Sequence, residues 1–119
     1  MGYLKDMLVK LSEELLGMTK KKSGLIYMAK CKIDGRCYIG LTTRTLKARK
    51  AEHIKAAMFD NSPLYFHGAI RNYGAKNFTW KVIARRKTLE GLANAEIKYI
   101  EKHAAFTEGF NSTPGGELG

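Results

Sequence analysis

Apolar residues recur at helical spacing in four segments of the 119-residue chain. The first segment covers residues 3–17, where an apolar stripe ends at Gly17, a residue suited to a helix C-cap. Thr45 and Thr88 are good N-caps for two later helices. The pattern therefore predicts an N-terminal helix and three further helices, over about 46–58, 64–73 and 89–105.

Three runs have the composition and alternation of β-strands. Residues 25–32 and 37–41 flank Asp34-Gly35, a dipeptide typical of a two-residue hairpin turn, and residues 78–85 alternate between the two sides of a third strand. We expect an α+β fold in which a small three-stranded antiparallel sheet is flanked by helices. The basic stretch 18–23 separates the extra N-terminal helix, so the predicted organisation is residues 1–23, helix and linker, followed by a domain over 24–117.

The predicted hairpin assigns its side chains to two faces. A two-residue turn places Cys31 opposite Tyr38 and Tyr27 opposite Thr42. One face then carries Tyr27, Ala29, Cys31, Tyr38 and Gly40, and the more apolar face carries Ile26, Met28, Ile39 and Leu41. Cys31 and Cys37 fall on opposite faces, which argues against a disulfide between them. At this stage the two tyrosines fit ordinary strand residues better than site residues.

Charge narrows the class of partner. Lys and Arg number 21 against 11 Asp and Glu, a net charge of +10, which favours a polyanion such as nucleic acid. A merely solubilising surface is the alternative, and an anionic membrane is a weaker one because the basic residues are spread along the chain. No apolar run reaches the roughly 20 residues that span a bilayer. There is also no secretory signal pattern, so we expect a cytoplasmic protein.

Three polar residues lie at the edge of predicted apolar stripes or within them. Arg49 and His53 are one helical turn apart, beside the apolar face of their helix. Glu96 falls in the middle of the stripe of the last helix, where an ionised carboxylate needs compensation. A metal ion would provide this, and so would a salt bridge to Arg49; we favour the metal.

Six short segments, in order, resemble the GIY-YIG nuclease family over roughly residues 24–117. The paired tripeptides correspond to Ile26-Tyr27 and Tyr38-Ile39-Gly40, and Arg49-x-x-x-His53 is similar to the family's helix motif. The remaining matches are 64–78, Glu96-x-x-Tyr99 and the closing stretch 109–116. The first tripeptide lacks its glycine, which is shifted to Gly24, and Phe110 stands where the family usually has tyrosine.

The resemblance implies a metal-dependent endonuclease that hydrolyses phosphodiester bonds in DNA. Tyr27 would be the base or would position the water, with His53 beside it, and its pKa would need to be lowered by nearby cations. Tyr38 would hold the phosphate or the water, and Arg49 would neutralise developing charge. Glu96 would hold one Mg²⁺ (or Mn²⁺) per active site. Asn111 would position the metal shell or the phosphate.

DNA contacts are expected from basic residues near these motifs and in the linker: Arg36, Arg44, Lys50, Lys20, Lys21 and Lys22. The alternative function is a non-catalytic nucleic-acid-binding module on the same fold, which the presence of Arg49 and Glu96 disfavours. A small basic ribosome-associated protein would explain the charge but not Glu96. The recognised site, nicking against double-strand cleavage, the biological role and the oligomeric state, including a homodimer, stay open from sequence.

Overall fold

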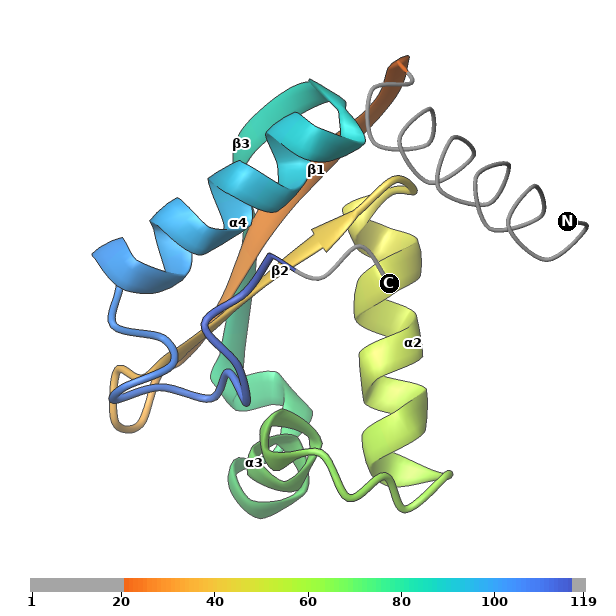
Figure 1. The fold of residues 1–119 in the computed structure, drawn as a ribbon. Coiled ribbons are helices and arrows are strands. Elements are labelled where there is room, and N and C mark those ends of the chain that lie inside the picture. Colours follow the sequence, from red (N-terminus) through yellow and green to blue (C-terminus); the bar gives the residue numbers. More distant parts are fainter. Residues whose placement is uncertain (1–20, 117–119) are drawn as a thin grey trace, which may run out of the picture.

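A computed structural model of the chain describes residues 21–116 (Figure 1). The predicted helix over 3–17 and Lys20 lie outside these residues. The elements in order are β1 (Lys21–Cys31), β2 (Cys37–Thr42), α2 (Leu46–Met58), α3 (Tyr65–Tyr73), the 3₁₀ turn η1 (Ala75–Asn77), β3 (Phe78–Thr88) and α4 (Leu89–Lys102). No helix in the described part of the chain is long and apolar enough to cross a membrane.

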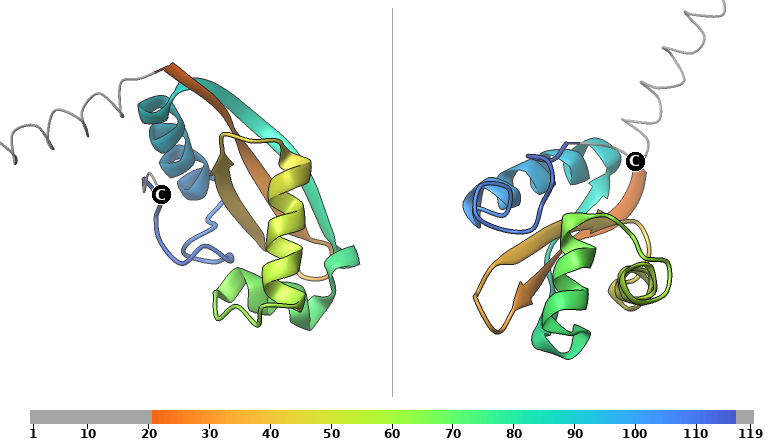
Figure 2. Two further views of the ribbon diagram at one scale, coloured as in Figure 1. Left: turned by 90° about the vertical axis from the view of Figure 1, so that its right-hand side faces the viewer. Right: turned by 90° about the horizontal axis from the view of Figure 1, so that it is seen from below.

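The three strands form one antiparallel sheet in the order β2-β1-β3, which confirms the predicted α+β class. Helix α4 covers one face of the sheet, and α2 and α3 cover the other (Figures 1 and 2). Each face therefore carries its own buried cluster, one around Ile26, Ile39 and Leu92 and the other around Phe66, Ile70 and Phe110. Cys31 and Cys37 are both free and lie in different clusters, as predicted.

The predicted hairpin register is wrong by two residues. Ala29, not Cys31, pairs with Tyr38, and Tyr27 pairs with Gly40. The turn is longer than two residues because only Gly35 adopts a positive φ, of 77°. A type I′ turn would require Asp34 to do so as well. Asp34 instead accepts a hydrogen bond from the backbone N–H of Arg36 at 2.9 Å. Because the shift is even, the predicted faces of the two strands are unchanged.

Strands β1 and β3 extend further than the apolar pattern predicted. β1 begins at Lys21 rather than Leu25, and β3 continues to Thr88, with Lys21 paired to Thr88. Backbone pairing needs no apolar side chains, so the polar ends of two adjacent strands can continue past the core. The pairing also slips between Ile26 and Tyr27, leaving an irregularity in the centre of the sheet.

The helix starts follow the predicted caps. The hydroxyl of Thr45 accepts from the N–H of Ala48 at 3.1 Å, and that of Thr88 accepts from the N–H of Gly91 at 2.9 Å. Helix α4 ends at Lys102, three residues earlier than predicted, because Ala104 adopts a left-handed φ of 51°.

The segment after α4 returns to the free edge of β2. The backbone N–H of Phe110 donates to the carbonyl of Cys37 at 2.9 Å, and the ring of Phe110 is fully buried in the cluster beneath α3. This segment therefore completes the wall of the site described next.

Candidate active site

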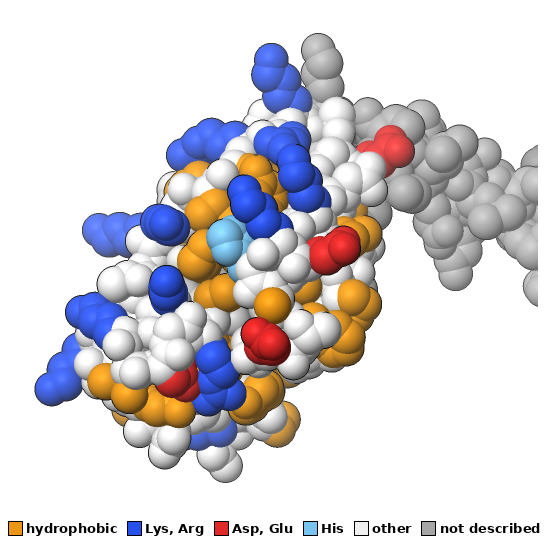
Figure 3. Space-filling view, turned by 90° about the vertical axis from the view of Figure 1, so that its left-hand side faces the viewer, with side chains coloured by type: hydrophobic (Ala, Val, Ile, Leu, Met, Phe, Trp, Pro, Cys, Tyr) orange, Lys and Arg blue, Asp and Glu red, His pale blue; other side chains and the backbone are white. Residues whose placement is uncertain are grey.

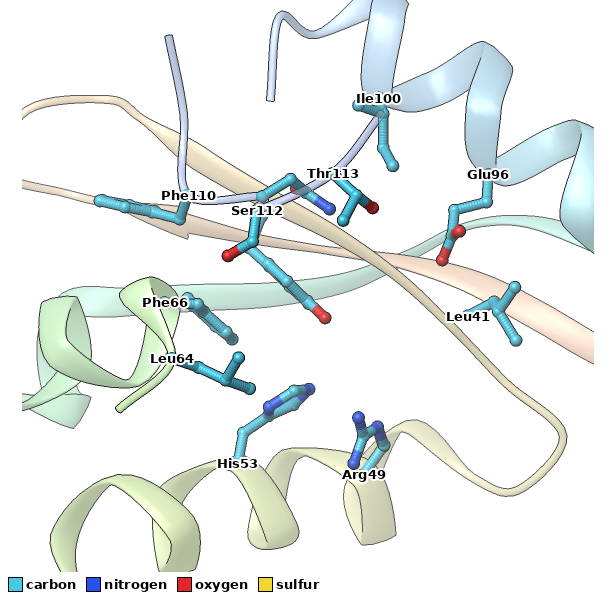
Figure 4. A pocket seen from close by; sticks show the side chains of 12 residues that line it. Leu41, Arg49, His53, Leu64, Phe66, Glu96, Ile100, Phe110, Ser112 and Thr113 are labelled. Carbon is cyan, nitrogen blue, oxygen red and sulfur yellow. The ribbon is translucent and has the colours of Figure 1, made fainter. Parts of the chain in front are cut away.

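A pocket of about 260 Å³ lies at the β2 edge of the sheet, where helices from both faces can reach (Figure 4). Arg49 and His53 enter it from α2, and Glu96 enters it from α4 on the opposite side. The remaining lining residues come from β2, from α3 and its N-cap, from α4 and from the C-terminal segment: Tyr38, Leu41, Leu64, Phe66, Ile100 and residues 110–113. The edge position of β2 explains how groups from two faces of one sheet share a single pocket.

Tyr27 lies behind the pocket wall. Its side chain is fully buried, and its hydroxyl lies 2.6 Å from Nε2 of His53. The ring centroids of Tyr27 and Tyr38 are 6.1 Å apart, and Trp80 stacks with Tyr27 at a centroid distance of 6.2 Å. The predicted tyrosine face is therefore not an open floor. It is an aromatic layer covered by α2 and α3, with Tyr38 exposed to the pocket.

Burial is the main cause of the pKa shifts in this aromatic layer. It raises the pKa of Tyr27 well above its usual value; the repulsion from Tyr38 acts in the same direction, and the attraction to Arg49 only partly offsets both. It also raises the pKa of Tyr38 despite Arg49. The lowered tyrosine pKa expected from sequence is therefore not found in this structure. Burial, with Arg49 and His67 as smaller contributions, lowers the pKa of His53 to about 3, so this imidazole is neutral at ordinary pH.

Arg49 is held at the pocket by a neighbour that sequence reasoning did not single out. Nη1 of Arg49 lies 3.4 Å from Oε2 of Glu52, one helical turn away on α2. Glu52 also pairs with Arg44, so one carboxylate contacts two guanidinium groups beside the site. This arrangement restrains the Arg49 side chain at the wall of the pocket.

Glu96 is half-buried and points toward the pocket (Figure 4). Its Oε1 accepts a hydrogen bond from the backbone N–H of Gly116 at 3.2 Å. Gly115 and Gly116 both have positive φ, of 96° and 92°, a conformation that favours glycine. Within residues 21–116 no group of three or more His, Cys, Asp or Glu side chains could hold a metal ion. A single carboxylate suits a hydrated Mg²⁺ that takes its other ligands from water and phosphate.

Asn111 makes two hydrogen bonds to the same backbone residue. Its Oδ1 accepts from the N–H of Ile39, and its Nδ2 donates to the carbonyl of Ile39, both at 2.8 Å. The side chain is 9% exposed. This pairing ties the C-terminal segment to β2 next to Tyr38, so the geometry shows a bracing role for Asn111.

The predicted DNA-contacting residues lie in different environments. Arg36 is engaged internally: its guanidinium bonds Asp34, Tyr65 and Tyr73 and lies 4.5 Å above the ring of Phe110. The others described, Arg44, Lys50 and Lys22, are exposed, and Lys21 starts β1. Figure 3 shows lysines and arginines spread over one side of the molecule, where basic side chains outnumber acidic ones.

Sequence reasoning missed His67 and Ser62, which extend the buried contacts of His53. Nδ1 of His53 lies 2.8 Å from Nε2 of His67, and Nδ1 of His67 lies 2.7 Å from Oγ of Ser62. The available signal was a histidine between Phe66 and Ile70 on the apolar face of a short helix.

A sequence model of the GIY-YIG catalytic domain matches residues 23–111, well over half of the chain. The protein therefore belongs to the GIY-YIG nuclease family, which confirms the resemblance and supports an endonuclease. No curated protein matches the chain significantly.

Two solved structures share this fold. One is a mutant of the catalytic domain of intron endonuclease I-TevI, with a TM-score of 0.69 and 13% identity, covering 77% of this chain and 95% of that chain. The other is the catalytic domain of homing endonuclease I-TevI, with a TM-score of 0.68 and 14% identity, covering 76% and 98%.

Proposed function

We propose that the chain is a DNA endonuclease that uses one Mg²⁺ or Mn²⁺ ion per active site. The observation that carries this proposal is the convergence on one pocket of Arg49 and His53 from one face of the sheet and Glu96 from the other, with Tyr27 hydrogen-bonded to His53 behind the pocket wall. Hydrolysis of a phosphodiester needs an activated water, charge stabilisation on the phosphate and help for the leaving oxygen. The pocket has a candidate group for each need.

The two tyrosines would hold the attacking water and take up its proton. Tyr38 lines the pocket and would hold the water or the phosphate. Tyr27 lies behind it, with its ring centroid 6.1 Å from that of Tyr38, and would accept the proton. His53, hydrogen-bonded to Tyr27, would receive the proton that Tyr27 gives up. A neutral imidazole is suited to that task because its Nε2 lone pair is free to accept.

Arg49 and Glu96 handle charge from opposite walls of the pocket. The guanidinium of Arg49 would bind the non-bridging phosphate oxygens. The Glu96 carboxylate would hold the metal ion, oriented by the N–H of Gly116. When bound, the ion would supply Lewis-acid stabilisation of the phosphate and the leaving oxygen. Asn111 would keep Tyr38 in place by bracing Ile39.

DNA is the proposed substrate because the chain carries a net charge of +10 and exposes Lys50, which follows Arg49 on α2, and Arg44, which pairs with the same Glu52 as Arg49. Arg44, Lys50 and the run Lys20-Lys21-Lys22 would contact backbone phosphates. Arg36 would contribute mainly by fixing the hairpin to α3, given its bonds to Tyr65 and Tyr73.

The test is cleavage of supercoiled plasmid with Mg²⁺, with Mn²⁺ and with a chelator, using Glu96→Gln and the matched control Glu101→Gln. Glu101 is exposed on the same helix. We expect Glu96→Gln to lose cleavage by about 10²–10³-fold, a size typical of losing one charge-stabilising group, and to lose Mn²⁺ binding followed by electron paramagnetic resonance.

Glu101→Gln should behave as the parent in both assays. Cleavage that survives the chelator, or an equally active Glu96→Gln variant, would contradict the metal assignment. DNA binding without cleavage in either metal would instead support the non-catalytic module.

A further inference from the structure

A chain of short hydrogen bonds leads from the buried tyrosine to the surface loop between α2 and α3. It runs from the hydroxyl of Tyr27 to His53 at 2.6 Å, from His53 to His67 at 2.8 Å, and from His67 to Ser62 at 2.7 Å. Exposure rises along this path: Tyr27 is 0% exposed, His53 2% and His67 5%, and Ser62 is half-buried. Four residues from three elements and a loop thus connect the aromatic layer to solvent.

Every hydrogen bond in this series can be donated in the same direction, from Tyr27 toward Ser62. A phenol O–H is a stronger donor than a neutral imidazole N–H, so Tyr27 donates to Nε2 of His53. The proton of His53 is then on Nδ1 and is donated to Nε2 of His67. The proton of His67 is likewise on Nδ1 and is donated to Oγ of Ser62. Each imidazole accepts at one nitrogen and donates at the other, which is the arrangement that conducts a proton.

The surroundings disfavour a stationary charge on any of the buried residues in this series of hydrogen bonds. Burial raises the pKa of Tyr27 and lowers the pKa of His53. Burial, Arg49 and Arg71 also lower the pKa of His67. A stationary Tyr27–His53 phenolate–imidazolium pair is therefore costly. If each imidazole releases its Nδ1 proton as it gains one at Nε2, neither ring carries a charge at the end of the transfer.

We propose that His67 and Ser62 are positioning residues that complete a proton path between Tyr27 and solvent. This rests on the proposed function of Tyr27 as the base. In the forward step the Tyr27 oxygen gains a proton from the pocket and gives its own to Nε2 of His53. His53 gives its Nδ1 proton to His67, and His67 gives its Nδ1 proton to Ser62, whose hydroxyl proton leaves to water. One proton enters and one leaves, and a proton passing back through the path restores both imidazoles.

The test compares His67→Gln with His103→Gln in single-turnover cleavage. Glutamine at position 67 can still accept from Nδ1 of His53 but cannot relay a proton. His103 is half-buried beside Tyr99, away from the pocket. We expect His67→Gln to slow cleavage by about 10²-fold, and Ser62→Ala to slow it less because water can replace the serine. His103→Gln should keep the parent rate.

Proton inventories in H₂O–D₂O mixtures separate a relay from mere packing. The parent should give a curved plot, from several protons in motion, and His67→Gln a straight one. The pH profile of the parent reflects all the groups that face the path: Tyr27 from β1, Tyr38 from β2, Arg49 and His53 from α2, and His67 and Arg71 from α3. The part of this pH profile that depends on proton transfer through His67 should disappear in His67→Gln. A parent-like rate, pH profile and proton inventory in this variant would overturn the proposal.

A measurement on the unaltered protein covers the case in which the variants do not fold. Nitrogen-15 NMR should find both His53 and His67 protonated at Nδ1, and protonation of His53 at Nε2 would overturn the relay. Failure of the proposed function looks different. In that case Tyr27→Phe cuts as fast as the parent, whereas failure of the relay alone leaves Tyr27→Phe inactive and His67→Gln active.

Discussion

Gly40 of β2 lies directly opposite Tyr27 of β1, and the Tyr27 side chain fills the space that a larger residue at position 40 would need. A β-carbon on Gly40 would lie 2.8 Å from Cε1 of Tyr27 and would overlap its hydroxyl. This contact gives a physical reason for the glycine of the second tripeptide. Because Gly40 has no side chain, the Tyr27 hydroxyl can lie over β2 and reach His53.

Gly40→Ala should therefore impair the site before it unfolds the protein. The added methyl must displace the Tyr27 ring, which is fully buried and cannot move away freely. Overpacking of this kind typically costs about 1–3 kcal/mol, and cleavage should fall further than that stability loss explains because the 2.6 Å bond to His53 is disturbed. Thermal unfolding and plasmid cleavage of the same preparation check this. Parent-like activity would show that Tyr27 can work from another position.

The glycines after Pro114 give a second prediction, about the orientation of Glu96. A β-carbon on Gly115 would lie 2.8 Å from Ile100 and 3.2 Å from the Glu96 carboxylate, at a φ of 96° that strains any other residue. We expect Gly115→Ala to weaken Mn²⁺ binding by about 10–100-fold, as losses around a metal ligand usually do.

The matched control is Gly68→Ala, where the new β-carbon approaches only Arg71, at 3.7 Å, inside α3. It should stabilise the protein by roughly 0.5–1 kcal/mol and leave Mn²⁺ binding unchanged. Equal Mn²⁺ affinity in both variants would show that the glycine loop does not orient Glu96.

Most of the fold could be predicted because its signals are local. Helix caps such as Thr45 and Thr88 and the alternation in residues 78–85 need no tertiary information. The hairpin register could not be read this way, because it depends on whether Asp34 or only Gly35 takes a positive φ. The polar ends of β1 and β3 were missed for a related reason, since only their mutual backbone pairing holds them as strands.

The site was predictable where a motif specifies a side chain and less so where packing sets its state. Arg49, His53 and Glu96 do share one pocket. The burial of Tyr27, and hence the direction of its pKa shift, depends on α2 and α3 closing over the tyrosine face. His67 becomes visible as a partner of His53 only when those helices pack together.

Asn111 gives a third prediction that separates bracing from metal binding. Asn111→Asp keeps an oxygen acceptor but loses the donor to the Ile39 carbonyl and places a carboxylate in a site 9% exposed. We expect a loss of roughly 1–3 kcal/mol in the free energy of unfolding and no gain in Mn²⁺ affinity. Tighter Mn²⁺ binding by the aspartate would show instead that position 111 contacts the ion.

The buried histidines predict how stability depends on pH. His53 has a pKa of about 3 when folded, against an ordinary value of 6.5. Between these values the unfolded chain binds more protons, so stability is fully present above about pH 6.5 and falls as the pH drops toward 3. At pH 5 the loss from His53 alone is about 2 kcal/mol, and His67 acts in the same direction. Urea unfolding of the parent from pH 7.5 to 5 should show this decline. A His53→Gln variant with the same decline would contradict the assignment.

DNA binding should separate exposed cations from internally bonded ones. Lys50 is exposed on α2, whereas the guanidinium of Arg36 is bonded to Asp34, Tyr65 and Tyr73. Each phosphate contact contributes about 0.9 to the slope of log affinity against log salt concentration, so Lys50→Gln should lower that slope by about 1 with little change in thermal stability. Arg36→Gln should lower the melting temperature more than it changes the slope. Anisotropy of a labelled random duplex at several salt concentrations, measured beside a selected pool, checks both.

Phosphate contacts carry no base information, so the selected pool should bind little better than random DNA. A selected site bound more than about 10³-fold tighter would show that the protein also has a base-reading surface.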